Sequence, residues 1–288
     1  MVFESLIRED NAEKHPWHVF LIGMLYATIG VVFHIWLFKG SIDNLSIFIT
    51  VFASIPLMYK IIILEEKKAK NTHEERNLLK EHKKALIAFI ALFIGICIAF
   101  TFWNLVLPQE YGKEIFRSQI NDVDSVREII NGRIVDPGNF LALMGNNFRV
   151  LLFSFLFSFF FGAGAIFILT WNASILAVVI GAYVRQSISA VSGASGFGII
   201  ASFLGSFSYG FFGYMTHGIF EIASYFLAGL AGGVVSVAVI RHDLFNKELK
   251  INKNYGRILK DSLWLLLFAI LFLILGAFVE TFVSPVVF

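Results

Sequence analysis

Residues 85–107 read ALIAFIALFIGICIAFTFWNLVL, an apolar run that contains no charged side chain. A run of this length crosses the hydrocarbon core of a bilayer, roughly 30 Å thick, as a single α-helix. The chain as a whole has the same character, since 57% of its 288 residues are hydrophobic and 33 are phenylalanine. Soluble domains average about 45–50% apolar residues. The composition therefore predicts an all-α, polytopic integral membrane protein.

Six further apolar runs of similar length flank this one. They lie at residues 17–38, 45–64, 148–171, 173–191, 217–240 and 263–283. A shorter apolar piece at residues 197–212 begins among small residues that include Gly193, Ser195, Gly196 and Gly198. Glycine permits tight turns and positive φ angles, so we expect a re-entrant or half-length helix there. The predicted fold is a transmembrane helix bundle of about seven spans plus this segment.

The distribution of basic residues predicts the orientation. Segment 65–84 carries seven Lys and Arg residues and segment 241–260 carries six, whereas segment 108–146 has four against six acids. Basic loops mark the cytoplasmic side, so the N-terminus is expected inside the cell membrane and the C-terminus outside. A full crossing at residues 197–212 would move the second basic cluster outside, which favours the re-entrant interpretation. The net charge of +2 gives no indication of nucleic-acid binding.

These boundaries divide the chain into four predicted parts. Residues 1–107 hold three spans and a charged cytoplasmic helical connector. Residues 108–146 form an extracytoplasmic amphipathic segment, in which apolar residues at helical spacing predict a helix over about 110–131. Residues 147–240 form a core membrane module, and residues 241–288 add a basic cytoplasmic loop and the last span.

Polar residues inside the core module are the candidate site. The run Thr216-His217-Gly218-Ile219-Phe220-Glu221 places a histidine and a glutamate four residues apart on one helical face. A charged residue at the centre of a membrane helix costs roughly 2.5–3.5 kcal/mol, so it usually faces a bundle interior. Arg185 lies on the preceding span, where an ion pair with Glu221 is geometrically plausible. The alternative is that all three polar residues lock the helices in register.

Two asparagines complete the predicted intramembrane polar site. Asn147 and Asn172 flank the apolar run between them, and we expect them to bond backbone groups at helix ends. Together with His217, Glu221 and Arg185 they concentrate the intramembrane polarity in the second half of the chain.

Two kinds of chemistry are weighed against this site. His217 and Glu221 offer two metal ligands where a catalytic zinc normally uses three, and Cys97 is the single cysteine, so no metal or other cofactor is predicted. Gly193-Ala194-Ser195-Gly196 fits the GxSG pattern of rhomboid intramembrane proteases, with His217 as a candidate base. A four-letter pattern among small residues arises easily by chance. We therefore predict no catalytic residue and no enzymatic activity.

The order of these features resembles the stage II sporulation protein M family. The residues on which this resemblance rests are Asn147, Gly162-Ala163-Gly164, Trp171-Asn172, and His217-Gly218 followed by Glu221 and the small-residue run 228–233. The resemblance covers about residues 146–240. Thr216 stands where the family usually has proline, and Ala173 stands where it usually has glycine, so local backbone bends are expected to differ.

The resemblance implies a membrane protein that acts within a complex, because the family's namesake works with cell-wall hydrolases in forespore engulfment. No catalytic residue comes with the family. The leading hypothesis is a non-enzymatic scaffold whose partners are membrane proteins or further copies of itself, beside membrane lipids and without nucleic acid. The second hypothesis is a transporter or channel that uses the polar intramembrane site. An intramembrane serine protease is the third.

Overall fold

The computed structural model describes residues 15–38, 42–71, 78–131, 137–159, 163–190, 196–241 and 253–283. Every regular element in these ranges is a helix. In chain order they are α3 (Pro16–Phe38), α4 (Leu45–Asn71), α5 (Leu78–Val106), α6 (Gln109–Ile115), α7 (Arg117–Asn131), α8 (Pro137–Phe157), α9 (Ala163–Ala190), α10 (Gly196–Arg241) and α11 (Lys253–Phe282). Seven of these helices are long and apolar enough to cross a membrane, which confirms the predicted fold class.

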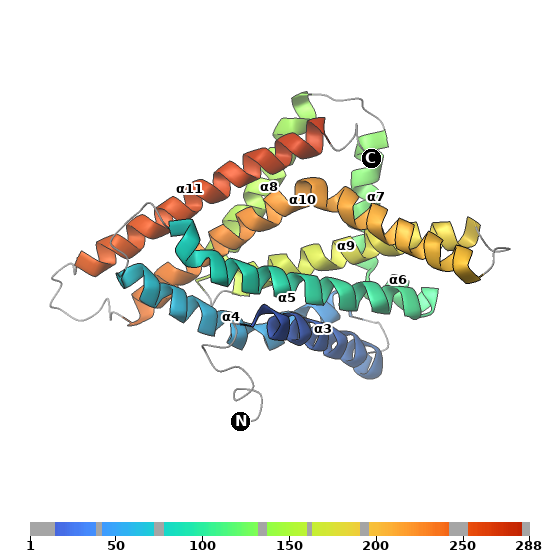
Figure 1. Ribbon diagram of the computed structural model, residues 1–288, viewed down its shortest axis with the longest axis horizontal. Coiled ribbons are helices and arrows are strands. Elements are labelled where there is room, and N and C mark those ends of the chain that lie inside the picture. The colour runs from blue at the N-terminus through green and yellow to red at the C-terminus, as the bar shows by residue number, and fades with distance from the viewer. Residues whose placement is uncertain are drawn as a thin grey trace.

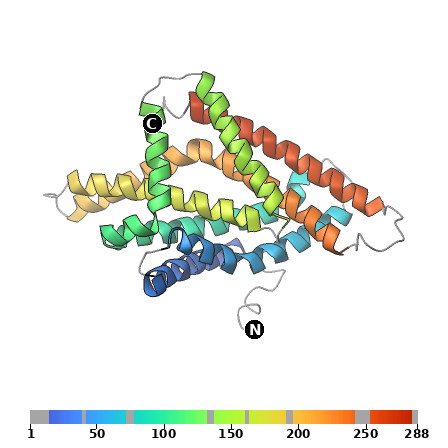
Figure 2. The same cartoon turned by 180° about the vertical axis from the view of Figure 1, so that it is seen from behind.

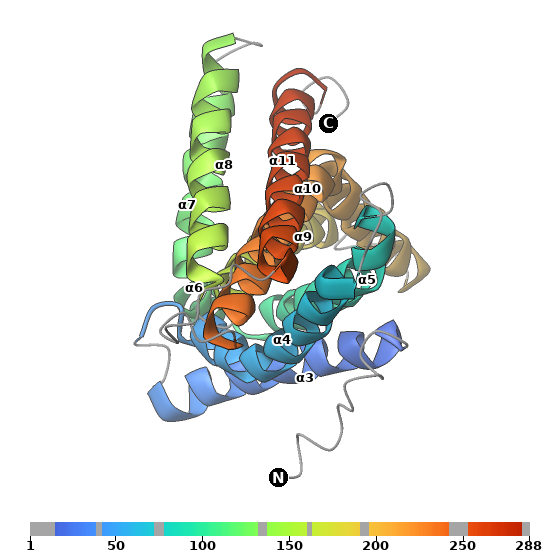
Figure 3. The same cartoon turned by 90° about the vertical axis from the view of Figure 1, so that its left-hand side faces the viewer.

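The helices form two groups joined by α9 and α10. Helices α3, α4 and α5 lie side by side with α9, whereas α8 and α11 stand together at an angle to them (Figures 1 and 3). Helix α10 runs first along α9 and then between α8 and α11, as the reverse view in Figure 2 also shows. The polar core module therefore sits where the two groups meet.

Glycine lets α3 and α5 cross at short range. A Cβ added at Gly23 would lie 2.6 Å from the Leu92 carbonyl oxygen, and one at Gly95 would overlap the backbone of Phe20. Small residues at membrane helix interfaces allow such backbone approach, which gives van der Waals contact its full area. The apolar run at residues 85–107 is thus packed against α3 through Gly95.

Helix α10 differs from the expected separate re-entrant element. Residues 197–212 continue without a break into the sixth apolar run, which makes a helix of 46 residues that bends midway (Figure 1). At about 1.5 Å per residue it is roughly 69 Å long, more than twice the hydrocarbon thickness. Glycine weakens a helix by only about 1 kcal/mol and does not end it as proline does. Gly196 and Gly198 form its first turn, and Gly193 and Ser195 lie outside the described residues.

The boundary between the fourth and fifth spans also falls elsewhere than predicted. Helix α8 ends at Phe157 and α9 begins at Ala163, whereas the apolar pattern placed the break near residue 172. Ser158 explains the earlier break, since its hydroxyl donates to the Ser154 carbonyl (2.6 Å) and accepts from the Ala165 amide (3.2 Å). One side chain therefore serves the end of one helix and the start of the next.

The segment predicted to lie outside forms two helices instead of one over residues 110–131. The break falls at Phe116, which is fully buried beside Ile115, and its ring meets the Phe100 ring edge-on. Helix α7 is fastened at its start to Asn44, whose amide donates to Ser118 (3.2 Å) and accepts from Gln119 (3.1 Å). Burial of two consecutive apolar side chains thus outweighs continuity of the helix.

Both flanking helices extend into the charged connector. Helix α4 continues to Asn71 and α5 begins at Leu78, and residues 72–77 lie outside the described part. The ends of the two helices are joined by a hydrogen bond between the buried side chains of Glu65 and His82.

Candidate functional site

Three helices meet at Glu221. The Asn147 side-chain amide on α8 donates to Glu221 Oε1 on α10 at 2.5 Å. The Glu221 carboxyl group also hydrogen-bonds to the carboxyl group of Glu280 on α11. Glu221 is 8% exposed and Asn147 is 7% exposed, so this contact excludes most solvent. A hydrogen bond between two carboxyl groups needs a proton as donor, so this contact forms when one of the two groups carries a proton.

Helix α11 approaches this point because Gly276 has no side chain. A Cβ at that position would lie 2.9 Å from Glu221 Cγ and 3.4 Å from the Glu221 nitrogen. Glu280 follows Gly276 by four residues, which places both on the same face of α11. Gly276 thus lets α11 approach α10 closely, and Glu280, one turn later on α11, bonds to Glu221 on α10.

A second polar contact lies about two turns earlier along α10. The Tyr214 hydroxyl donates to Asn172 Oδ1 at 3.1 Å, and the Asn172 amide donates to the Ile168 carbonyl at 2.8 Å within α9. The Tyr214 ring packs against the His217 ring, with centroids 5.4 Å apart. Tyr214 and Tyr225 are both close enough to the two carboxyl groups to interact with them electrostatically.

Four of the five predicted polar residues lie at α10: His217 and Glu221 belong to it, and Asn147 and Asn172 bond to it from neighbouring helices. The two asparagines are not at helix ends, however. Asn147 lies inside α8 and Asn172 inside α9, so neither ends a helix. Each makes a hydrogen bond to a side chain of α10, and Asn172 also bonds a backbone group, the Ile168 carbonyl within α9. Interhelical hydrogen bonds of this kind give a buried amide in a membrane its partner.

Arg185 does not pair with Glu221, which corrects the predicted ion pair. Its guanidinium group donates to the Asn104 carbonyl oxygen and, at 2.9 Å, to Asn104 Oδ1. Asn104 in turn donates to the Ala177 carbonyl at 3.1 Å, and Gly181 leaves room for its amide. The last carbonyls of a helix lack backbone partners and carry partial negative charge. The end of α5 thus supplies the acceptors that Arg185 needs.

Helices α8 and α10 also meet through small residues further along. The Ser154 hydroxyl donates to the Tyr225 carbonyl at 2.9 Å, and a Cβ at Gly232 would overlap the Phe155 carbonyl oxygen. This is the close approach that the run 228–233 predicts. Direct backbone contact therefore continues the interface that begins at Asn147.

The sequence analysis missed Glu280, Asn104 and Tyr214. Glu280 is the one acid in the apolar run 263–283 and could have been found by the same reasoning as Glu221. Asn104 gives no such signal, since a single asparagine near a helix end is common. Within the described ranges no three His, Cys, Asp or Glu side chains are arranged to hold a metal ion. Ser195 lies outside those ranges, so the serine and histidine pair of the protease hypothesis stays a prediction.

Seven apolar helices with a buried polar contact at their centre define a polytopic membrane protein. The family model for Stage II sporulation protein M matches residues 84–285, and the chain belongs to this family. The match extends beyond the predicted region 146–240 in both directions and includes Glu280 and α5 from residue 84 onward. An uncharacterised protein of Methanocaldococcus jannaschii is 27% identical over 168 residues, which cover 58% of this chain and 81% of that protein. No solved structure matches the chain significantly.

Proposed function

We propose that this protein is a non-enzymatic scaffold of a membrane complex. The supporting observation is how its intramembrane polar groups are used. Glu221 bonds to side chains of α8 and α11, Arg185 bonds to the end of α5, and Asn172 bonds to Tyr214. Buried polar contacts of this kind fix helix register more than they add stability. Such a rigid core suits a protein that presents surfaces to others.

The first part of α10 is the candidate surface for partners. Phe197, Ile200 and Leu204 are each more than half exposed there, and the segment runs along α9 away from α8 and α11 (Figure 1). The partner class that fits an exposed apolar helix within a membrane is another transmembrane helix, from a different membrane protein or from a second copy of this chain.

Photo-crosslinking of the full chain in its own membranes tests the scaffold proposal. A photoreactive phenylalanine analogue at Ile200 is compared with one at Leu271, which is 52% exposed on α11. The proposal predicts a discrete protein adduct at Ile200, and the same adduct when Glu221→Gln is added and folding is retained. Diffuse lipid labelling alone at Ile200, or loss of the adduct in a well-folded Glu221→Gln variant, would contradict it.

The proposed orientation has a cytoplasmic N-terminus and an external C-terminus. An odd number of spans puts the termini on opposite sides, and the basic segments 65–84 and 241–260 favour this direction. Reporter fusions at the two ends are expected to be active on opposite sides of the membrane. A C-terminal reporter active in the cytoplasm would reverse the assignment.

A transporter or channel is the second candidate, and the Glu221 and Glu280 pair is the observation that favours it. Buried carboxyl groups that hold a proton occur on proton paths in membrane proteins. Purified protein in liposomes is expected to show no proton movement under the scaffold proposal. A pH-dependent flux that disappears in both Glu221→Gln and Glu280→Gln would replace the scaffold with a transporter.

A further inference from the structure

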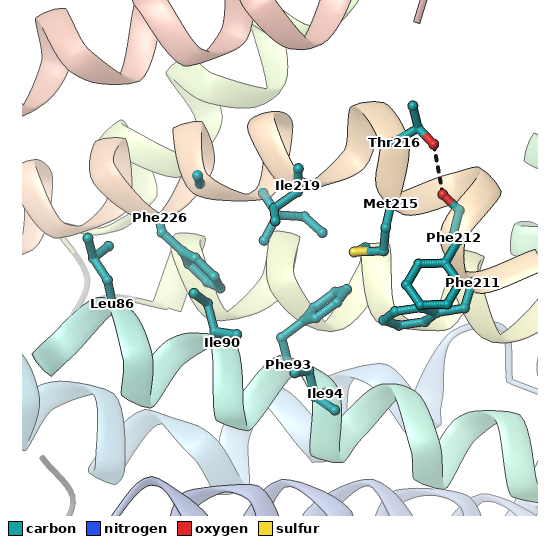
Figure 4. A pocket seen from close by; sticks show the side chains of 12 residues that line it. Leu86, Ile90, Phe93, Ile94, Phe211, Phe212, Met215, Thr216, Ile219 and Phe226 are labelled. Atoms are coloured by element: carbon teal, nitrogen blue, oxygen red, sulfur yellow. Dashed lines mark hydrogen bonds between the residues drawn. The ribbon is translucent and has the colours of Figure 1, made fainter. Parts of the chain in front are cut away.

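An apolar groove of about 540 Å³ lies between α5 and α10. Figure 4 shows side chains of the two helices facing each other across it: Leu86, Ile90 and Phe93 from α5, and Met215, Ile219 and Phe226 from α10. The lining residues of α5 fall inside its apolar run at residues 85–107, which is long enough to cross the membrane. The groove is therefore at membrane depth and separate from the polar contact at Glu221.

The chemistry of the lining identifies the occupant as hydrocarbon. Thr216 is the one lining residue with a polar side chain, and its hydroxyl already donates to the Phe212 carbonyl at 2.8 Å. A buried water needs two to four polar partners, which this groove does not offer. A polar or peptide ligand would likewise leave its hydrogen-bonding groups without partners at membrane depth.

The size of the groove selects one lipid chain over a helix. Along α5 the lining runs from Leu86 to Ile94, about 12 Å at 1.5 Å per residue. A helix that crosses the membrane is roughly 30 Å long, so this groove would cover less than half of its length. An extended acyl chain is much thinner and fits.

A lysine stands at one end of the groove. Lys83 precedes Leu86 by three residues and Ile90 by seven, so it lies on the groove face of α5 one turn beyond the lining. Its side chain is exposed and, among the described residues, forms no ion pair. Lys84 is equally an exposed lysine but is turned about 100° away around the helix. We propose that the groove binds an acyl chain of an anionic membrane lipid whose headgroup phosphate meets Lys83.

Native mass spectrometry of the full-length protein tests this proposal. The protein is purified in mixed micelles of phosphatidylglycerol and phosphatidylcholine with identical acyl chains, and the lipids retained per protein are counted. One tightly retained lipid with a preference for phosphatidylglycerol is expected. Lys83→Gln should lower that preference about fivefold, which corresponds to the ~1 kcal/mol that one basic residue contributes near an anionic surface. Lys84→Gln should leave it nearly unchanged.

A second pair of variants tests the groove itself. Ala223→Phe places a ring in the groove and should abolish retention of that lipid, whereas Ala201→Phe on the exposed first part of α10 should not. If Ala223→Phe does not fold, Ile90→Trp fills the groove from α5 and replaces it.

Three results would overturn the proposal. Equal effects of Lys83→Gln and Lys84→Gln would rule out the contact between Lys83 and the headgroup. Full lipid retention in the filled-groove variants would rule out the groove as the acyl-chain site. A dimer that the filled-groove variants convert to a monomer would assign the groove to a second copy of the chain.

Discussion

The contact between Asn147, Glu221 and Glu280 gives the sharpest energetic prediction. Glu221→Leu removes two interhelical hydrogen bonds and leaves the Asn147 amide and the Glu280 carboxyl group buried without that partner. Interhelical hydrogen bonds in membranes are worth about 0.6 kcal/mol on average and up to about 1.7. A polar group left without a partner adds roughly 1–3 kcal/mol. We expect Glu221→Leu to destabilise the folded protein by about 2–6 kcal/mol.

Two companion variants separate the bond from mere burial. Glu221→Gln keeps an acceptor for Asn147 and supplies a donor for Glu280, so its free energy of unfolding should fall by less than about 1 kcal/mol. Asn147→Leu combined with Glu221→Leu should be scarcely less stable than Glu221→Leu alone, because the second change removes a group that has already lost its partner. The coupling energy of this double-mutant cycle should be about 0.5–1.7 kcal/mol.

The assay is reversible unfolding of the full chain in mixed micelles by titration with a denaturing detergent. Additive effects of Asn147→Leu and Glu221→Leu, with a coupling energy near zero, would refute the proposed contact. A Glu221→Gln variant as unstable as Glu221→Leu would show that the geometry of the bonds is wrong.

Three further predictions follow from individual contacts. Gly232→Leu should push α8 away from α10, because a Cβ at that position overlaps the Phe155 carbonyl oxygen, and the yield of folded protein should fall sharply. Gly196→Leu is the control, since Gly196 has open space around it and its yield should not fall. Gel filtration compares the two yields. Arg185→Gln should loosen the end of α5 and raise amide hydrogen exchange around residues 104–112, with Glu221 unaffected; unchanged exchange there would contradict the contact with Asn104. The Cys97 side chain is 3% exposed, so its thiol should resist a water-soluble maleimide until the protein is unfolded. Rapid labelling of the folded protein would show that α5 packs differently.

The sequence predicts the helices of this protein well because their physical cause is local. A long apolar run must become a helix in a bilayer, whatever lies beside it, and the segments with seven and six basic residues favour one orientation. The run at residues 85–107 therefore indicates both the class of protein and the position of α5.

Helix ends and partners were harder to predict because their causes are not local. The break at Ser158 depends on one hydroxyl, whereas the apolar pattern continues across it. Arg185 was expected to pair with Glu221 because the two have opposite charge and lie on adjacent spans, but its guanidinium group bonds to the backbone and side-chain oxygens of Asn104 near the end of α5. Glu221 was identified correctly as a buried group, and its true partners, Asn147 and Glu280, come from helices that only the fold brings together.

Infrared spectroscopy of the full-length protein in lipid can show whether Glu221 lies in a dry contact of three helices. We expect a carbonyl band of a protonated carboxyl group that shifts only slowly after transfer to D₂O. That band should be lost or displaced in both Glu221→Gln and Glu280→Gln and retained in Glu110→Gln, which alters an exposed acid. A band that exchanges at once, or one that neither intramembrane variant changes, would place the two carboxyl groups in water and contradict the account.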